Sequence, residues 1–472
     1  MIAKLKAIPY LPLLTALMVL RLVAAACGPL SPDESYYWLW AQHPALGYYD
    51  HPPMVSWWIM VSTSVFGHSP LAVRLPFVLS FVVLSWLMWD AARALFNEAV
   101  AKRTLLWLNA CQLLSIGSVV ATPDPPSVLM WAGGLWALCR LMASGKAWWW
   151  PVFGVFAGLG VEAKYTNLFL GLGVLVWFVM DKPARRWLLT PWPWLGALVA
   201  VLLMLPNILW NLDHGWITVS KQFGRIGASH FTVQYLIELV LAQPLLLNVL
   251  IFAFVVIGML AAFQNGDSRL KLLAALPLPL VAYLVVHVFH DRIQGNWPAP
   301  VYPGLVLLSA VVAEGITEGK ILRAKAWAAP FGIGISVVVL VVLALSGWVP
   351  LPGAAGLGQG WDRLSQDIVI RQSHAGAGWI ATTDYDTEGE LSYHLPSAHV
   401  VGMAERTRYD WPAEIIGQKA LIVAGLDHQP DLARCFDGLT DMGIVSRLDK
   451  PGRKSDYRLW SGILKSPACE VD

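Results

Sequence analysis

Long apolar runs separated by short polar connections fill residues 1–349 of the chain. A helix needs roughly 20 apolar residues to cross the hydrocarbon core of a bilayer. About eleven runs approach that length, the fifth being short, and they lie near residues 8–27, 70–92, 104–121, 126–142, 147–162, 165–180, 192–210, 233–262, 272–289, 298–316 and 326–349. The pattern predicts a polytopic α-helical membrane protein.

Lysine and arginine are concentrated in alternate connections between these runs, and cytoplasmic loops carry an excess of both residue types. The residues that fall on one side are Lys4, Lys6, Lys102, Arg103, Arg140, Lys146, Lys182, Arg185, Arg186, Arg269, Lys271, Lys320, Arg323 and Lys325. This predicts a cytoplasmic N-terminus. The connections 28–69, 122–125, 211–232 and 290–297, and everything after residue 350, then lie outside the cytoplasm.

A cleaved signal peptide is an alternative interpretation of the first run, since LVAAAC before Gly28 resembles a processing site. Arg21 interrupts the apolar stretch, which favours a retained span. The segment 28–69 is then an external loop with interfacial helices.

Residues 350–472 have a different pattern. The glycine-rich PGAAGLGQG is typical of a linker, and the short apolar runs DIVI, GWIATT, HVVGM and ALIVAGL alternate with polar, helix-like stretches. We therefore expect a transmembrane domain over 1–349 and a small extracytoplasmic α/β domain over 350–472. Cys435 and Cys469 lie in the second domain. An oxidising compartment permits a disulfide between them, although the sequence leaves open whether they meet.

Composition agrees with a membrane protein, because 57% hydrophobic and 14% charged residues lie outside the usual soluble range. The net charge of +2 is too small to indicate a nucleic-acid partner. No internal repeat is visible, which argues against transporters built from inverted repeats.

The external loop opens with SPDE, and this stretch holds two carboxylates. Ser31 as N-cap, Pro32 at the first helical position and Glu34 at the third make a capping box, which accounts for Glu34. Asp33 is not needed by the box. It either favours the positive end of the helix dipole or serves a site. Adjacent helical residues diverge by roughly 100°, so Asp33 is the better catalytic candidate of the two.

A further carboxylate, Asp124 in ATPDPPSVLM, lies at the predicted outer mouth of two spans. Helix capping is one explanation. A carboxylate at the membrane boundary is also a functional candidate, because its burial is costly without a purpose or partner. Cationic side chains predicted on the same side are His51, Lys164, Arg225, His290 and Arg292. Each alone is typical of an interfacial anchor, but together with the acids they could hold an anionic phosphate beside a base.

At these residues the chain resembles the polyprenyl-phosphate-sugar-dependent glycosyltransferases of the GT-C fold. The relatives are glycosyltransferase family 39 and the neighbouring lipid A aminoarabinose transferase family. The resemblance covers most of the membrane part, and DESYYWLWAQHPALGYYDHPPM is its most specific motif. The others are RLPFVLS, ATPDPPSVLMWA, GLGVEAKYTNLFL and GNWPAPVYPG. It implies an enzyme of the bacterial inner membrane that decorates lipopolysaccharide, lipid A or another envelope glycan.

The resemblance implies a catalytic acid at Asp33, with Glu34 beside it, and a second at Asp124. The lysine that the aminoarabinose branch carries before a double proline is His51 here, and its arginine after the acidic pair is replaced by Tyr36. The branch's donor-phosphate contacts therefore cannot be copied unchanged. The substrate-binding candidates are Tyr36, Tyr37, Tyr49, Asn296 and Trp297. Interfacial anchoring explains most of the loop's aromatic residues, and stacking on a sugar is the alternative.

The implied reaction is a single displacement at the anomeric carbon, in which the lipid phosphate leaves, an acceptor hydroxyl attacks and the centre inverts. A carboxylate with a pKa of about 4 is ionised at neutral pH and can accept the hydroxyl proton. Cationic side chains in a water-poor cavity stabilise the leaving phosphate. The activated lipid donor makes a nucleotide-binding motif unnecessary, and none is visible.

Several alternatives remain open at the level of sequence. A transporter or flippase of a lipid-linked sugar would share the spans and acids, and an oligosaccharide ligase, polymerase or protein O-glycosyltransferase would share the lipid carrier. A divalent metal could join an acid to His43 and His51, although their spacing is not compact. DYDTEGE mimics the start of a calcium loop, but its twelfth position is Leu395, and helix capping near Asp384 explains it better.

Overall fold

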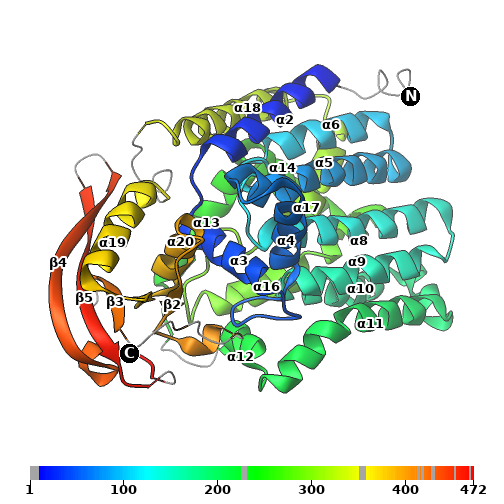
Figure 1. Cartoon of the computed structure of the whole chain (residues 1–472). Helices are drawn as coiled ribbons and strands as arrows, with labels where there is room; N and C mark the ends of the chain where they lie inside the picture. Colours follow the sequence, from blue (N-terminus) through cyan, green and yellow to red (C-terminus); the bar gives the residue numbers. More distant parts are fainter. Residues whose placement is uncertain are drawn as a thin grey trace. The chain divides into compact units, whose positions relative to one another are not determined.

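The structure is a computed structural model that describes residues 10–224, 231–264, 266–349, 358–409, 411, 415, 419–426, 431–450, 453–466 and 469–471. Its contacts divide the chain into two compact units (Figure 1). The helical unit comprises residues 1–22, 50–55 and 75–340, and the mixed unit comprises 23–49, 56–74 and 341–472. The predicted boundary at residue 349 stays a prediction, but the external loop packs largely with the C-terminal residues.

Helices coincide with every predicted apolar run. Three helices continue from one unit into the other, namely α2 (Leu11–Cys27), α5 (Pro70–Leu95) and α18 (Ile321–Leu345). The other α-helices of the helical unit are α6 (Glu98–Ala110), α7 (Gln112–Gly117), α8 (Asp124–Ser144), α9 (Trp149–Ala163), α10 (Leu168–Met180), α11 (Trp192–Asp213), α12 (Ile217–Phe223), α13 (Gln234–Leu247), α14 (Val249–Gln264), α15 (Ser268–Ala275), α16 (Leu278–His287) and α17 (Tyr302–Gly315). Short 3₁₀ helices cover Tyr165–Asn167 (η1), Lys182–Leu189 (η2) and Ala299–Val301 (η4).

Five helices within the described residues are long and apolar enough to cross a membrane, or up to eight if each bent pair is one span. The five cover Pro70–Leu95, Asp124–Ser144, Trp192–Asp213, Ser268–His287 and Ile321–Leu345. The predicted run 104–121 holds two helices, α6 and α7, with Cys111 extended between them, and the run 233–262 holds α13 and α14, bent by 104° at Asn248. The number of eleven spans therefore stays a prediction.

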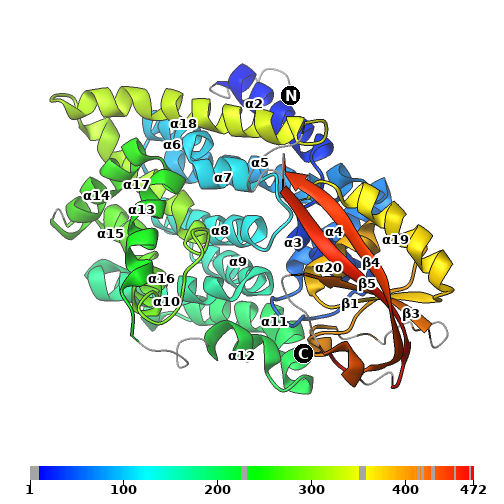
Figure 2. The ribbon, with the colours of Figure 1, turned by 90° about the vertical axis from the view of Figure 1, so that its left-hand side faces the viewer.

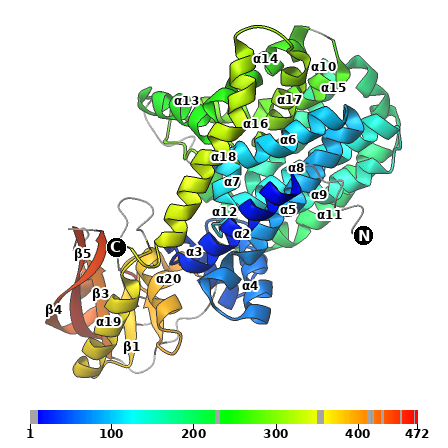
Figure 3. The ribbon, with the colours of Figure 1, turned by 90° about the horizontal axis from the view of Figure 1, so that it is seen from above.

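Glycines bring α9 directly against α11 (Figure 2). A Cβ added at Gly154 would lie 2.1 Å from the carbonyl oxygen of Gly196, and one at Gly158 would lie 2.6 Å from that of Ala200. The two backbones can approach this closely only without side chains. GLGVEAK therefore begins on a tightly packed helix pair, as expected for small residues four apart in a membrane protein. Figure 3 shows α6, α17 and α14 side by side in the same unit.

The mixed unit contains α3 (Pro32–Gln42) and α4 (Met54–Phe66) from the external loop, α19 (Trp361–Ala375), α20 (Tyr385–His394) and a five-stranded sheet. The strands are β1 (Trp379–Thr382), β2 (Val400–Gly402), β3 (Lys419–Gly425), β4 (Phe436–Lys450) and β5 (Arg453–Leu464), in the order β2-β1-β3-β5-β4. The first three are parallel, whereas β5 pairs antiparallel with β3 and β4. Short 3₁₀ turns lie at Arg406–Arg408 (η6) and Leu432–Arg434 (η7).

Alternating strand residues form two separate cores on the two faces of this sheet. Ile380 and Leu421 pack with Trp361 and Ile368 of α19 and Leu391 of α20. The opposite core contains neighbouring strand positions and Cys435, and its members include Trp379, Ala381, Ala420, Ile422 and Phe436. The α/β pattern expected of the C-terminal region is thus present.

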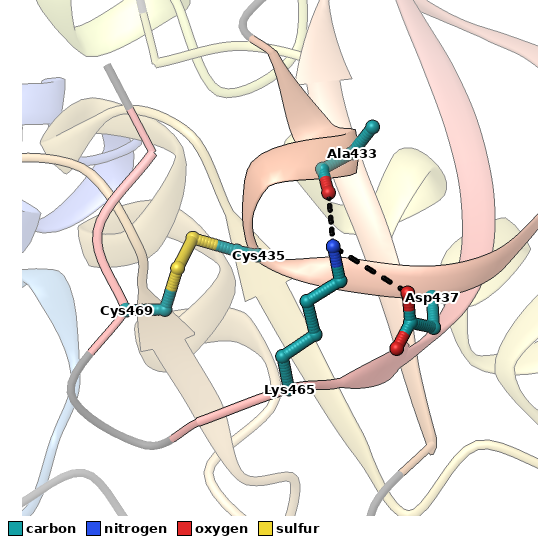
Figure 4. Close-up of a disulfide and its surroundings, with 5 residues drawn as sticks. All are labelled: Ala433, Cys435, Asp437, Lys465 and Cys469. Atoms are coloured by element: carbon teal, nitrogen blue, oxygen red, sulfur yellow. Dashed lines mark hydrogen bonds and ion pairs between the residues drawn. A yellow bond between two sulfur atoms is a disulfide. The ribbon is translucent and has the colours of Figure 1, made fainter.

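A disulfide joins Cys435 to Cys469, with their Cα atoms 5.5 Å apart (Figure 4). Lys465 lies at the same corner and donates to the carbonyl oxygen of Ala433 at 2.6 Å, while its Nζ lies 3.4 Å from Oδ1 of Asp437. The pairing that the sequence left open is therefore made, and it joins Cys469 to the residue that precedes β4. Cys27, Cys111 and Cys139 are free thiols.

Candidate active site

Asp124 is the first residue of α8, and Pro125 and Pro126 follow it. Proline is well tolerated in the first turn of a helix, because the amide hydrogens there have no partner within the helix. The sequence TPDPP therefore starts a helix and leaves a carboxylate at its N-terminal end, where the helix dipole favours negative charge. The Asp124 side chain is 14% exposed.

Lys164 provides the cation for this carboxylate. Its Nζ lies 2.8 Å from Oδ1 of Asp124, and its side chain is 8% exposed. Lys164 caps the C-terminus of α9 in an extended conformation, which turns the chain into the 3₁₀ helix η1. Asn167 stabilises this turn by donating to Ser127 of α8 at 2.6 Å. The extended Lys164 and the hydrogen bond from Asn167 to Ser127 thus explain why the chain turns within the motif EAKYTN.

Asn296 contacts the other oxygen of the same carboxylate. Its Nδ2 donates to Oδ2 of Asp124 at 2.6 Å. Three predicted residues from three separate motifs, Asp124, Lys164 and Asn296, therefore form one cluster. The sequence had assigned them to different roles and did not predict that Lys164 pairs with Asp124.

A cavity of about 200 Å³ opens at this cluster. Asp124, Asn296, Thr122, Ser118 and Ser80 supply polar groups to its lining. The rest of the lining is mostly apolar, namely Phe81, Leu84, Leu113, Leu114, Gly117, Val120, Pro125, Val128 and Ala299. A mostly apolar cavity with a few convergent polar groups is typical of a ligand site.

Arg21 supports the wall of this cavity. It is 2% exposed and donates to the side-chain oxygen of Ser115 at 2.6 Å and to Asn109 at 3.1 Å. Its guanidinium lies 4.3 Å from the ring centroid of Phe81, a lining residue. Arg21 thus holds the break between α6 and α7, where Cys111 is extended. In the sequence Arg21 interrupts an apolar run and favours a retained span, but its contacts with Ser115 and Asn109 were not predicted.

The remaining cationic candidates of the helical unit do not contact Asp124 in any described interaction. Arg292 pairs with Glu238 at 2.9 Å, and both side chains are well exposed. His290 is near the carbonyl oxygen of Val286, at 3.1 Å. Trp297 packs edge-on against His287, with 5.2 Å between ring centroids. His51 is half-buried, and Arg225 lies outside the described residues.

Glu34 forms a buried ion pair with Arg74 in the mixed unit. Arg74 donates to both of its carboxylate oxygens at 2.7 Å, and the backbone N–H of Ser31 donates to Oε2 at 2.9 Å. The capping box is therefore present, as expected. Arg74 also donates to the carbonyl oxygens of Gly28 and Pro29. Arg74, in RLPFVLS, is the functional partner that sequence reasoning missed.

Asp33 differs from its neighbour because its side chain is exposed. The aromatic candidates near it are packed into the same unit. Tyr36 and Tyr37 are buried, with Tyr36 centred 4.9 Å from the Tyr385 ring, and Arg408 lies 4.9 Å from the ring centroid of Tyr49. Packing thus accounts for Tyr36 and Tyr37. No group of three or more histidine, cysteine or acidic side chains with metal-binding geometry occurs among the residues that the structure describes.

Comparisons with known proteins agree with the resemblance carried by the motifs. A family model described as dolichyl-phosphate-mannose-protein mannosyltransferase matches residues 50–210. The lipid A galacturonosyltransferase RgtD of Rhizobium johnstonii is 24% identical over 419 residues, which cover 83% of this chain and 85% of the relative. An undecaprenyl phosphate-α-4-amino-4-deoxy-L-arabinose arabinosyl transferase of Serratia proteamaculans is 25% identical over 74% of this chain and 66% of its own length.

The fold also matches solved structures along nearly its whole length. ArnT from Cupriavidus metallidurans bound to undecaprenyl phosphate superposes with a TM-score of 0.70 at 16% identity, covering 96% of this chain and 98% of that one. The apo form gives a TM-score of 0.67, at 15% identity and with 95% and 96% coverage. These comparisons show that the chain has the fold of the ArnT structures and that its sequence is similar to those of the named glycosyltransferases. A polytopic helical membrane protein, as the apolar pattern predicts, agrees with this fold.

Proposed function

We propose that the protein is a glycosyltransferase that moves a monosaccharide from a polyprenyl-phosphate donor to an extracytoplasmic acceptor. The observation that carries this proposal is that Asp124 and Asn296 line a largely apolar cavity and that Lys164 pairs with Asp124. An isoprenoid phosphate combines an apolar chain with an anionic head, and this cavity offers complementary groups to both. The undecaprenyl phosphate named for ArnT supports the same donor class.

Lys164 is the donor-phosphate contact that the described structure favours most. A phosphate oxygen would share the ammonium with Asp124, and the weakly polar surroundings would strengthen this interaction. Asp124 then orients Lys164, and Asn296 fixes the second carboxylate oxygen. We assign no catalytic part to Glu34, because Arg74 engages both of its oxygens.

Asp33 is the proposed base, since it is exposed and its carboxylate does not belong to the capping box. The acceptor hydroxyl oxygen forms a bond to the anomeric carbon while the bond from that carbon to the phosphate oxygen breaks. Asp33 takes the hydroxyl proton, and the polyprenyl phosphate leaves with the bonding electrons. The anomeric centre is inverted.

The acceptor proposed is lipid A or another part of lipopolysaccharide, and the sugar is a uronic acid or an amino-pentose. The names of the two curated relatives support these classes. We place the transferase in the bacterial inner membrane with about eleven spans, a cytoplasmic N-terminus and residues 350–472 outside.

The test is transfer of radiolabel from a panel of polyprenyl-phosphate monosaccharides to membrane lipids by the purified full chain in one detergent. The panel contains galacturonic acid, 4-amino-4-deoxyarabinose and a neutral hexose. We expect label to reach lipid A from one acidic or amino sugar with wild type, and no transfer with Asp33→Asn. Asp367→Asn, at an exposed position on α19, is the matched charge control and should retain activity. Undiminished transfer by Asp33→Asn would remove Asp33 from the mechanism.

A further inference from the structure

Helices α3 and α20 touch through their backbones, although about 350 residues separate them in the chain. A Cβ added at Gly389 would lie 2.8 Å from the backbone nitrogen of Tyr36, 3.0 Å from its Cα and 3.1 Å from the carbonyl carbon of Ser35. Real Cβ atoms essentially never approach backbone atoms at the shorter of these distances. Glycine is therefore required at position 389 for α20 to lie where it does against α3.

Aromatic contacts extend this interface on both sides of Gly389. Tyr36 lies 4.9 Å from Tyr385 and 6.5 Å from Tyr409, measured between ring centroids. Trp38 packs edge-on against Tyr393 at 5.1 Å. Aromatic pairs of this kind stabilise a contact by about 0.5–1.5 kcal/mol beyond their buried area. The C-terminal region thus fixes α3 along most of its length.

The opposite attachment of α3 is the Glu34 and Arg74 ion pair, which ties its first turn to α5. Asp33 occupies the same first turn and is exposed. A base must lie within hydrogen-bond reach of the proton it accepts, and a displacement of about 1 Å can cost on the order of a hundredfold in rate. The position of Asp33 therefore depends on what holds α3.

We propose that α20 is a positioning element of the transferase, and that Gly389 is the residue through which the C-terminal region places Asp33. This inference rests on the proposed role of Asp33 as the base. It assigns a catalytic purpose to a region in which sequence motifs showed none. Residues Tyr385 to His394 then serve the reaction without touching the substrate.

Asp386, in the first turn of α20, interacts with Asp33 through charge. Burial and the charges of Asp384 and Asp33 raise the pKa of Asp386 to about 6, while Tyr385 and Arg408 oppose the shift.

The first test is Gly389→Ala in the full chain. We expect kcat to fall at least tenfold, with the KM for the donor unchanged within twofold, because Lys164 and the cavity belong to the other unit. Gly425→Ala is the matched control: it lies in the same unit, and a Cβ there meets nothing within 4 Å. Thermal unfolding of both variants separates displacement from loss of the fold. A folded Gly389→Ala enzyme with wild-type kcat would overturn the proposal.

The second test is Asp33→Asn, which separates this inference from the proposed function. Activity that survives in Asp33→Asn would refute Asp33 as the base, whereas wild-type kcat in a folded Gly389→Ala enzyme would refute the positioning role alone.

Discussion

Arg74 donates two parallel hydrogen bonds to Glu34, from Nε to Oε1 and from Nη2 to Oε2, each 2.7 Å long. Both residues are buried, with 6% and 1% of their surfaces exposed. This fork geometry is the one in which arginine binds carboxylates most specifically. It explains why a loop that holds two adjacent acids uses them differently: Glu34 anchors α3, and Asp33 remains exposed.

Glu34→Gln should destabilise the chain strongly. The substitution leaves the Arg74 guanidinium buried without its counter-charge, and breaking a buried pair in this way typically costs about 3–5 kcal/mol. Chemical unfolding of the purified protein in detergent measures the effect. Glu238→Gln is the control, because it breaks the exposed pair with Arg292 and should change stability by less than about 1 kcal/mol. Equal midpoints for the two variants would contradict the anchoring role.

Lys164→Met should abolish donor binding and transfer while leaving a folded chain. Asp124 would lose its cation but keep the hydrogen bond from Asn296, and the proposed phosphate contact would disappear. We expect kcat/KM to fall at least a hundredfold. Lys164→Arg retains the charge and should recover part of the loss, although the guanidinium cannot reproduce a point contact. Donor affinity can be measured by competition with unlabelled polyprenyl phosphate. Unchanged affinity in Lys164→Met would exclude Lys164 from the phosphate site.

Hydrophobic periodicity predicted where helices lie, but not where they break. Apart from Glu238, the run 233–262 contains only apolar and uncharged polar residues, so its pattern predicts one span. In the structure Asn248 has φ 103° and donates to the carbonyl oxygens of Ala110 and Ala328. These partners come from distant parts of the chain. A break stabilised by tertiary hydrogen bonds leaves no signal in the local pattern.

In the candidate site, too, the sequence predicted the residues but not the contacts between them. Residue chemistry indicated Asp124, Lys164 and Asn296, since each lies in a motif at a predicted membrane boundary. Their mutual contacts depend on how α8, η1 and the turn before α17 are arranged, and sequence spacing carries no information on this. The role of Gly389 was likewise hidden, because nothing in DYDTEGE shows that a second helix approaches its backbone.

Removing the disulfide should lower the stability of the C-terminal sheet against unfolding. Cys435 and Cys469 are 34 residues apart, and closing a loop of this size restricts the unfolded chain by about 3–4 kcal/mol in the chain-entropy description. We expect Cys435→Ser with Cys469→Ser to make residues 358–466 sensitive to protease at lower denaturant than in the wild type. Wild type treated with reductant should behave in the same way. Cys139→Ser, which changes a free thiol, is the control and should leave the protease pattern unchanged.

Buried acids on α20 predict that the mixed unit loses stability as pH rises. Glu388 and Glu390 are 2% and 0% exposed. Burial raises the pKa of each to about 7, while the neighbouring Tyr409 opposes the shift of Glu388 and His394, whose Nε2 lies 3.5 Å from Oε2 of Glu390, opposes that of Glu390. Both groups therefore bind protons more tightly in the folded than in the unfolded state, where the carboxyl pKa is near 4.5.

Stability contributed by the protonated forms is thus complete below about pH 4.5 and is lost as pH rises through 7. We expect the denaturant midpoint for proteolysis of residues 358–466 to decrease from pH 5 to pH 8. Glu388→Gln and Glu390→Gln should each weaken that dependence, because a neutral amide does not ionise. Asp367→Asn, exposed on α19, should leave it as in wild type. A midpoint that rises over this interval would show that the two acids are ionised in the native state and that a buried cation compensates them.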